Sequence, residues 1–128
     1  MTQLHEVDGL TVADVMHRHV TTLPLTASVG ELREYFGASG SRRLAVLVDG
    51  SRYAGAVPED SLAADVHVAS QAVDHVTDEP TIGPGAPAVD ARTLALALPT
   101  RRVPVVDESG ELVGIVAIDE HHTRFCGT

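Results

Sequence analysis

Two arginine pairs, Arg42-Arg43 and Arg101-Arg102, precede apolar segments that resemble each other. A guanidinium group presents five donors in a planar fork that matches a phosphate or a carboxylate. Arg43 and Arg102 lie 59 positions apart, so they could meet an anionic ligand from two equivalent positions. Alternatively, these arginines could form ion pairs with carboxylates of the same protein, because the chain has 18 acidic residues against nine arginines. The sequence leaves both interpretations open.

Acidic side chains follow two further apolar segments at matching places. Asp60 comes shortly after Pro58, in a pattern typical of a helix start. A carboxylate at this position could accept hydrogen bonds from two sugar hydroxyls, or it could cap the helix and favour its dipole. The same alternatives apply to Asp119 and Glu120 in the second half of the chain.

The sequence predicts no catalytic site and no metal site. It has no lysine, its single cysteine is Cys126 near the end, and no serine lies in a GxSxG context. Seven histidines are present, including the pair His121-His122, but none occurs in an HExxH or comparable ligand spacing. We therefore expect solvated histidines with at most a mild pH response, and a protein that is not an enzyme.

The net charge of −9 disfavours partners that are themselves polyanions. Nucleic acids and anionic membranes attract proteins through basic side chains, so neither is an expected partner. No apolar stretch approaches the length of a bilayer span, and the first residues lack the pattern of a secretory signal. A cytoplasmic protein is expected.

The chain contains an internal repeat. Residues 42–57 read RRLAVLVDGSRYAGAV, and residues 101–116 read RRVPVVDESGELVGIV. Upstream, His19-Val20-Thr21 recurs as His75-Val76-Thr77, now 56 positions apart, which suggests a three-residue insertion in the loop 83–87. A duplicated unit of this size is expected to bury its hydrophobic face against its copy, and a cleft between copies is a natural ligand site.

Periodicity predicts the same element order in both copies: short helix, extended segment, helix, hairpin and helix start. In the first copy these elements are expected at residues 11–16, 20–23, 28–37, 44–48 with 53–57, and from residue 58. In the second copy they are expected at residues 70–75, 76, 88–98, 103–106 with 112–116, and 118–125.

This element order, with these residues, resembles the CBS domain, which occurs as tandem pairs called Bateman modules. The matching residues are Asp14-Val15-Met16, Val20-Thr21-Thr22, the segment RRVPVVD at 101–107 and the segment LVGIV at 112–116. The resemblance divides the chain into motifs at 8–64 and 66–126. It implies an α/β (α+β) fold with two βαββα-like motifs packed by pseudo-twofold symmetry, and a flat homodimer of two chains.

The resemblance also implies clefts that bind adenosine compounds such as AMP, ATP or S-adenosylmethionine. In such clefts an aspartate six residues after a strand glycine holds the ribose, and a hydroxyl residue three after it meets the phosphate. Backbone of the early extended segment meets the adenine.

Both copies depart from this pattern. After Gly55, the hydroxyl position is Pro58 and the aspartate position is Ser61, with Asp60 one residue early. After Gly114, the corresponding residues are Ala117 and Glu120, again with Asp119 one residue early.

We therefore expect a stand-alone CBS-pair regulatory or sensor module that weakly binds an adenosine-containing ligand and requires no cofactor. Its predicted ligand-binding residues are Thr22, Leu23, Val46 and Asp60 for one cleft, Glu79, Val105 and Asp119 for the other, with Arg43 and Arg102 beside them. The alternative is a ligand-free, dimeric interaction module whose clefts are filled by its own side chains and which binds an unidentified protein partner.

Overall fold

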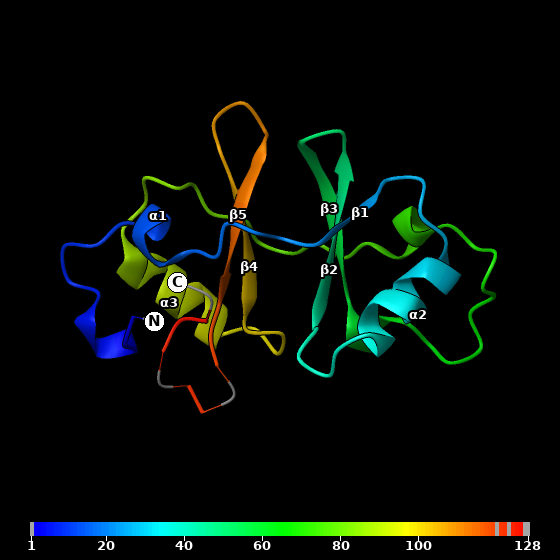
Figure 1. Cartoon of the computed structure of the whole chain (residues 1–128), viewed down its shortest axis with the longest axis horizontal. Coiled ribbons are helices and arrows are strands. Elements are labelled where there is room, and N and C mark those ends of the chain that lie inside the picture. Colours follow the sequence, from blue (N-terminus) through cyan, green and yellow to red (C-terminus); the bar gives the residue numbers. More distant parts are fainter. Residues whose placement is uncertain (1, 120, 123, 127–128) are drawn as a thin grey trace. The chain divides into compact units, whose positions relative to one another are not determined.

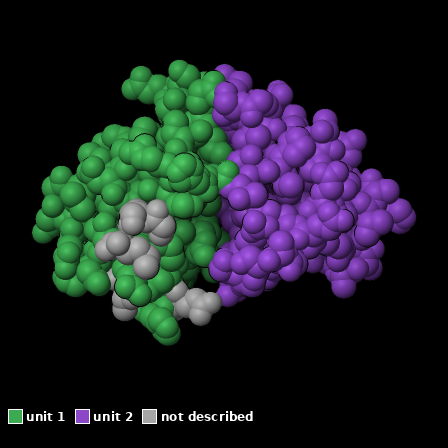
Figure 2. All heavy atoms as spheres, in the orientation of Figure 1, with its two compact units in different colours: residues 1–20, 80–128 green, residues 21–79 purple. Residues whose placement is uncertain are grey.

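A computed structural model of the chain describes residues 2–119, 121–122 and 124–126, arranged in two compact units. Figure 2 colours them: one contains residues 21–79, and the other contains residues 1–20 together with residues 80–128. Each combines small helices with short strands, as expected for an α+β fold. The predicted motif boundaries describe the duplicated sequence, whereas the compact units divide the chain after residues 20 and 79.

In the unit of residues 21–79, three strands form a mixed sheet in the order β1-β2-β3 (Figure 1). Strand β1 (Thr22–Pro24) is parallel to β2 (Leu44–Asp49), which forms an antiparallel hairpin with β3 (Arg52–Pro58). The hairpin predicted from the apolar runs on either side of Asp49-Gly50 is confirmed.

Helix α2 (Val29–Gly37) follows β1 in the same unit. The Ser28 Oγ accepts a hydrogen bond of 3.2 Å from the Glu31 amide, so Ser28 is the predicted N-cap. The helix buries its apolar stripe in a core with strand residues and with the short 3₁₀ helix Ala72–His75. The buried members of this core are Ala27, Leu32, Phe36, Ala45, Leu47, Val57 and Ala72.

The other unit is built from helix α1 (Val12–Val15), helix α3 (Ala88–Leu96) and the hairpin of β4 (Arg102–Val106) with β5 (Leu112–Ala117). A 3₁₀ turn, Leu4–Glu6, precedes them. Both helices contact the hairpin. Their shared core contains Leu4, Val7, Val12, Val15, Met16, Ala88, Ala91, Ala95, Val103, Val105, Val116, Ile118 and Phe125.

Three predicted helices are not α-helices in the described residues, and the one predicted at 70–75 is the 3₁₀ helix Ala72–His75. Residues Glu59–Ser61 form only a 3₁₀ turn, because the Ser61 hydroxyl donates to the Pro58 carbonyl at 2.8 Å and Leu62 is already extended. Between Ile118 and Phe125 the chain reverses, and these two residues form an antiparallel bridge. This reversal buries Phe125 completely, which a helix continuing from β5 would not do. None of the described helices is long and apolar enough to cross a bilayer.

The hydrogen bonds of the hairpins determine which residues of the two copies correspond. The Glu59 amide donates to the Arg43 carbonyl, and the Ile118 amide donates to the Arg101 carbonyl. Arg43 therefore corresponds to Arg101, and the predicted equivalence of Arg43 with Arg102 is wrong by one residue. Because each copy carries two adjacent arginines, residue identity alone could not fix this register.

The same comparison corrects the predicted insertion. His17 bridges Ile115, and Thr77 bridges Ala56 at the matching position of the other hairpin. His17 thus corresponds to Thr77, whereas the sequence repeat aligned His19 with His75. The connecting loops and the hairpin turn differ in length by one residue each between the two copies. A single three-residue insertion at 83–87 is therefore not required.

Candidate ligand-binding sites

The first predicted site lies in the unit of residues 21–79, where β1 and β2 run in parallel. Thr22 pairs with Val46, and Leu23 pairs with Leu47. The Val46 side chain is buried, and Leu23 packs against the core of this unit. The structure thus brings three of the predicted residues together on two adjacent strands.

Asp60 and Arg43 lie at one end of this sheet. Asp60 is in the 3₁₀ turn that follows β3, and its neighbour Glu59 bonds to the Arg43 carbonyl at 3.0 Å. The side chains of Asp60 and Arg43 are both exposed. The Asp60 carboxylate neither caps the turn nor makes a hydrogen bond or ion pair with any other described residue. The capping interpretation is therefore not supported for Asp60.

The two motif positions of this copy cannot supply the usual hydroxyl and carboxylate. Pro58 occupies the hydroxyl position, and the Ser61 hydroxyl is already engaged by the Pro58 carbonyl. Asp60 lies one residue before the position of the family aspartate, and Glu59 precedes it in the same turn.

In the other unit, Asp119 is engaged by the chain itself. Its Oδ1 accepts a hydrogen bond of 3.3 Å from the Arg124 amide, and its Oδ2 lies 3.7 Å from the Arg124 Nε. The Asp119 side chain is only 17% exposed. Asp119 thus stabilises a reverse turn. The alternative predicted from the sequence was that it caps a helix, so its role is structural but the element is different. Glu120 lies outside the described residues.

Arg102 has a structural environment as well. Its Nη1 donates to the carbonyls of Thr100 at 3.0 Å and of Ile118 at 3.3 Å. Arg101, the residue that corresponds to Arg43, donates from Nε to His122 Nε2 at 3.0 Å and from Nη1 to the Leu98 carbonyl. Arg42 donates to the Tyr35 carbonyl at 2.9 Å and lies over the Tyr35 ring. These contacts are made to carbonyls, an aromatic ring and a histidine, and ion pairs of these arginines with carboxylates stay a prediction.

Glu79 belongs to the unit of residues 21–79, whereas Val105 and Asp119 belong to the other unit. The Glu79 carboxylate accepts a hydrogen bond of 2.8 Å from the Thr77 hydroxyl. Burial, together with the charge of Glu79, raises the pKa of Tyr53 to about 12. Val105 is fully buried between its neighbours in the core. The grouping of these residues in one cleft stays a prediction.

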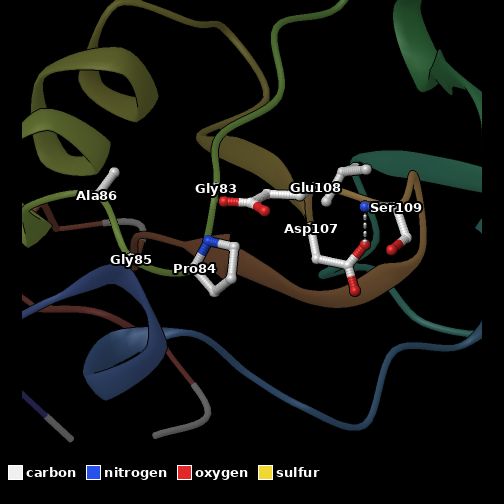
Figure 3. A pocket seen from close by; sticks show the side chains of 8 residues that line it. Gly83, Pro84, Gly85, Ala86, Asp107, Glu108 and Ser109 are labelled. Atoms are coloured by element: carbon white, nitrogen blue, oxygen red, sulfur yellow. Dashed lines mark hydrogen bonds between the residues drawn. The ribbon is translucent and has the colours of Figure 1, made fainter.

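A pocket that the sequence did not predict lies in the unit of residues 1–20 and 80–128 (Figure 3). It has a volume of about 660 Å³ and is lined by Gly83, Pro84, Gly85, Ala86, Val106, Asp107, Glu108 and Ser109. Ile82 pairs in parallel with Val105, so the loop after Ile82 and the turn after Val106 meet at one end of the sheet. The Asp107 Oδ1 accepts bonds from the Ser109 and Glu111 amides, which orders the turn. No local sequence signal marks this pocket, because it depends on the parallel pairing of Ile82 with Val105.

Metal binding has no support in the described part of the chain, which contains no group of three or more His, Cys, Asp or Glu residues able to hold an ion.

Comparison with known families identifies this fold. The model of the CBS domain matches the chain twice, at residues 12–67 and 72–120. The chain therefore belongs to the CBS domain family and contains a tandem pair of these domains. Comparison with curated protein sequences gave no significant match.

Three solved structures with the same fold are similar to this chain at low sequence identity. The CBS-pair protein CBSX2 from Arabidopsis thaliana, in complex with AMP, is 24% identical with a TM-score of 0.73, covering 85% of this chain and 90% of that chain. The CBS domains of a transcriptional regulator from Streptococcus pneumoniae are 18% identical with a TM-score of 0.74, covering 86% and 94%. The cystathionine beta-synthase pair domain from Shewanella oneidensis is 18% identical with a TM-score of 0.75, covering 84% of this chain. The present chain spans 64% of the length of that Shewanella chain.

Proposed function

We propose that this CBS pair is a cytoplasmic, non-catalytic regulatory module that weakly binds an adenosine-containing ligand, with AMP, ATP and S-adenosylmethionine as the candidates. The binding site is the end of the β1-β2-β3 sheet that carries Asp60 and Arg43. The observation that carries the proposal is the exposed Asp60 carboxylate, which has no partner among the described residues. A carboxylate in this state can accept hydrogen bonds from two ribose hydroxyls. Such charge-assisted hydrogen bonds are stronger than those between neutral groups.

The relatives add support at the level of the family. The structure of CBSX2 in complex with AMP concerns a protein with the same fold. In the present chain, the motif hydroxyls are replaced by Pro58 and Ala117, so contacts to a phosphate are fewer and the affinity is low. The two copies are also unequal, because the Asp119 carboxylate is engaged by Arg124. We therefore expect one ligand per chain, bound at Asp60.

The second candidate function is a ligand-free module that associates with itself or with another protein. The engagement of Asp119 and Arg102 by the chain's own groups favours it, since a cleft filled in this way has no free donors and acceptors for a nucleotide. A homodimer is compatible with both functions. Sedimentation equilibrium of the pure chain tests it, and a monomer at all concentrations would contradict it.

Isothermal titration with AMP, ATP and S-adenosylmethionine separates the two functions. We expect heat with at least one of them, and an affinity about tenfold weaker in Asp60→Asn because a charge-assisted bond is lost. Glu59→Gln is the matched control, since Glu59 is the adjacent exposed carboxylate and its replacement should leave the affinity unchanged. Absence of heat with all three compounds would overturn the proposal and favour the interaction module. Equal affinities of Asp60→Asn and the wild type would place the ligand elsewhere.

A further inference from the structure

The chain closes the end of β5 with its own C-terminal residues. Ile118 forms an antiparallel bridge with Phe125, and the Cys126 amide donates to the Ala117 carbonyl at 2.7 Å. The Asp119 amide donates to the Arg124 carbonyl at 3.1 Å. We call residues 124–126, in this paired arrangement with residues 117–119, the C-terminal latch. The latch also contacts the N-terminal segment, because the Phe125 amide donates to the Thr2 carbonyl at 2.9 Å.

The reversal that forms the latch depends on His122. Its amide donates to the Asp119 carbonyl at 3.0 Å, and its backbone has a φ of 56°. A positive φ is unfavourable for a residue with a side chain, so interactions elsewhere must hold it. Arg101 is the other described residue besides glycine with a positive φ, at 55°. These two strained residues are joined directly by the hydrogen bond from Arg101 Nε to His122 Nε2.

This hydrogen bond requires a neutral imidazole. Nε2 is the acceptor, so the single ring proton of neutral histidine is on Nδ1. A protonated imidazole has two donors and no acceptor, and it would place a second cation 3.0 Å from the Arg101 guanidinium. Histidine is the side chain that ordinarily changes charge between pH 5 and 8. Protonation of His122 therefore removes this contact.

The surroundings of the turn contain more cations than anions among the described groups. Arg101 contacts His122, Arg102 binds the Ile118 carbonyl, and Arg124 is paired with the Asp119 carboxylate. From the N-terminal segment, the latch is contacted by the uncharged residues Thr2 and Gln3. His5 on that segment lies 3.4 Å from Glu6, and His121 is the exposed neighbour of His122. Glu120 lies outside the described residues.

We propose that the C-terminal latch is a pH-sensitive device, in which protonation of His122 breaks its bond with Arg101 and shifts the latch toward an open state. Opening separates residues 124–126 from β5 and releases the Asp119 carboxylate from Arg124. The equilibrium between closed and open latch shifts because neutral His122 accepts the Arg101 bond in the closed latch, whereas protonated His122 cannot. It does not depend on the ligand proposed above, because the device is defined by contacts within this chain.

Cys126 is a built-in probe of this opening. It is the one cysteine of the chain, it lies in the latch, and it is partly buried. Burial raises the pKa of the Cys126 thiol, so its reaction with a maleimide is slow while the latch is closed. Comparing variants at the same pH removes most of the intrinsic pH dependence of thiol reactivity.

The experiment measures the maleimide reaction rate of the full chain at pH 7.5 and pH 5.5, without nucleotide. In His122→Gln, the amide oxygen can accept the Arg101 bond at any pH, whereas His122→Lys carries a permanent cation. At pH 5.5 we expect the wild type to react about fivefold faster than His122→Gln, the factor that corresponds to one hydrogen bond. At pH 7.5 these two should react alike, and His122→Lys should react about fivefold faster than both.

His121→Gln and His5→Gln are the matched controls, and both should follow the wild type at each pH. Hydrogen exchange of the Cys126 amide, corrected for its intrinsic rate, provides a second measurement of the same opening. Equal rates of the wild type and His122→Gln at pH 5.5 would overturn the proposal. So would a loss of the acid effect in His121→Gln or His5→Gln.

Discussion

Gly114 lies so close to Met16 that a Cβ added at position 114 would come within 2.7 Å of the Met16 Sδ. The same Cβ would lie 2.9 Å from the His17 carbonyl oxygen. Gly55 has the same relationship to Val76, whose Cγ1 would be 2.9 Å from a Cβ at position 55. Each repeat glycine therefore allows the segment after a short helix to approach the second strand of a hairpin. The contacts link residues that are distant in sequence within each unit.

Replacement of Gly114 by alanine should destabilise the protein by about 2 kcal/mol, because the added methyl group meets a backbone carbonyl that cannot move away. The Met16 side chain could adjust, but the His17 carbonyl is fixed by the two hydrogen bonds between His17 and Ile115. The measurement is urea denaturation followed by circular dichroism.

Gly37→Ala is the matched control for that substitution. Gly37 ends helix α2, and a Cβ there would meet nothing within 4 Å. Alanine should therefore be neutral or stabilise the protein by about 0.5 kcal/mol. Equal stability changes in Gly114→Ala and Gly37→Ala would show that the close approach at Gly114 has no energetic role.

The pH dependence of stability in acid should contain a contribution from Asp14. The Thr11 amide and hydroxyl donate to its Oδ2 at 2.8 and 3.1 Å, and these bonds lower the pKa of the Asp14 carboxyl below 3.8. A carboxyl whose pKa is lower in the folded state stabilises that state at pH values above its pKa in the unfolded state. This stabilisation is lost as the pH falls. Asp14→Asn should thus be less stable than the wild type at pH 7, with a smaller difference at pH 3. Asp8→Asn is the matched control, because it removes an exposed carboxylate nearby and leaves the Thr11 hydrogen bonds in place.

The local elements could be predicted because their causes are local. Ser28 caps α2, the hairpin turn follows Asp49, and the apolar runs at 44–48 and 103–106 are strands. The family could be predicted too, because the segment RRLAVLVDG at 42–50 recurs as RRVPVVD at 101–107, and each copy is followed by a strand with a central glycine. Each of these features is determined by neighbours within a few residues.

The register of the repeat and the state of the second site could not be predicted. Residue identity aligns Arg43 with Arg102. However, the Ile118 amide donates to the carbonyl of Arg101, so Arg101 is the residue that corresponds to Arg43. The turn that engages Asp119 depends on burying Phe125, and the pocket beside Gly83 depends on the parallel pairing of Ile82. These contacts join residues that sequence periodicity does not connect.

Alkaline stability should reveal the partly buried Tyr53, whose pKa is raised to about 12 by burial and by the charge of Glu79. A raised pKa in the folded state gives stability that is present below the unfolded value of 10 and is lost as the pH rises toward 12. Tyr53→Phe keeps the ring, so its stability should fall less steeply over this range. Tyrosinate absorbance should show a late titration step for Tyr53, and this step should be absent in Tyr53→Phe. Glu79→Gln should move the late step to lower pH, and an unmoved step would exclude Glu79 as a cause.

The corrected repeat register predicts different roles for Arg102 and Arg43. Arg102 binds the carbonyls of Thr100 and Ile118, so Arg102→Gln should reduce stability by about 1–2 kcal/mol through lost charged hydrogen bonds. Arg43 is exposed, so Arg43→Gln should reduce stability less than Arg102→Gln does, and it should weaken adenosine-ligand binding. Urea denaturation and calorimetric titration of both variants separate the two effects. If the two arginines were equivalent, as their spacing in the sequence suggests, both variants would lose stability and affinity together.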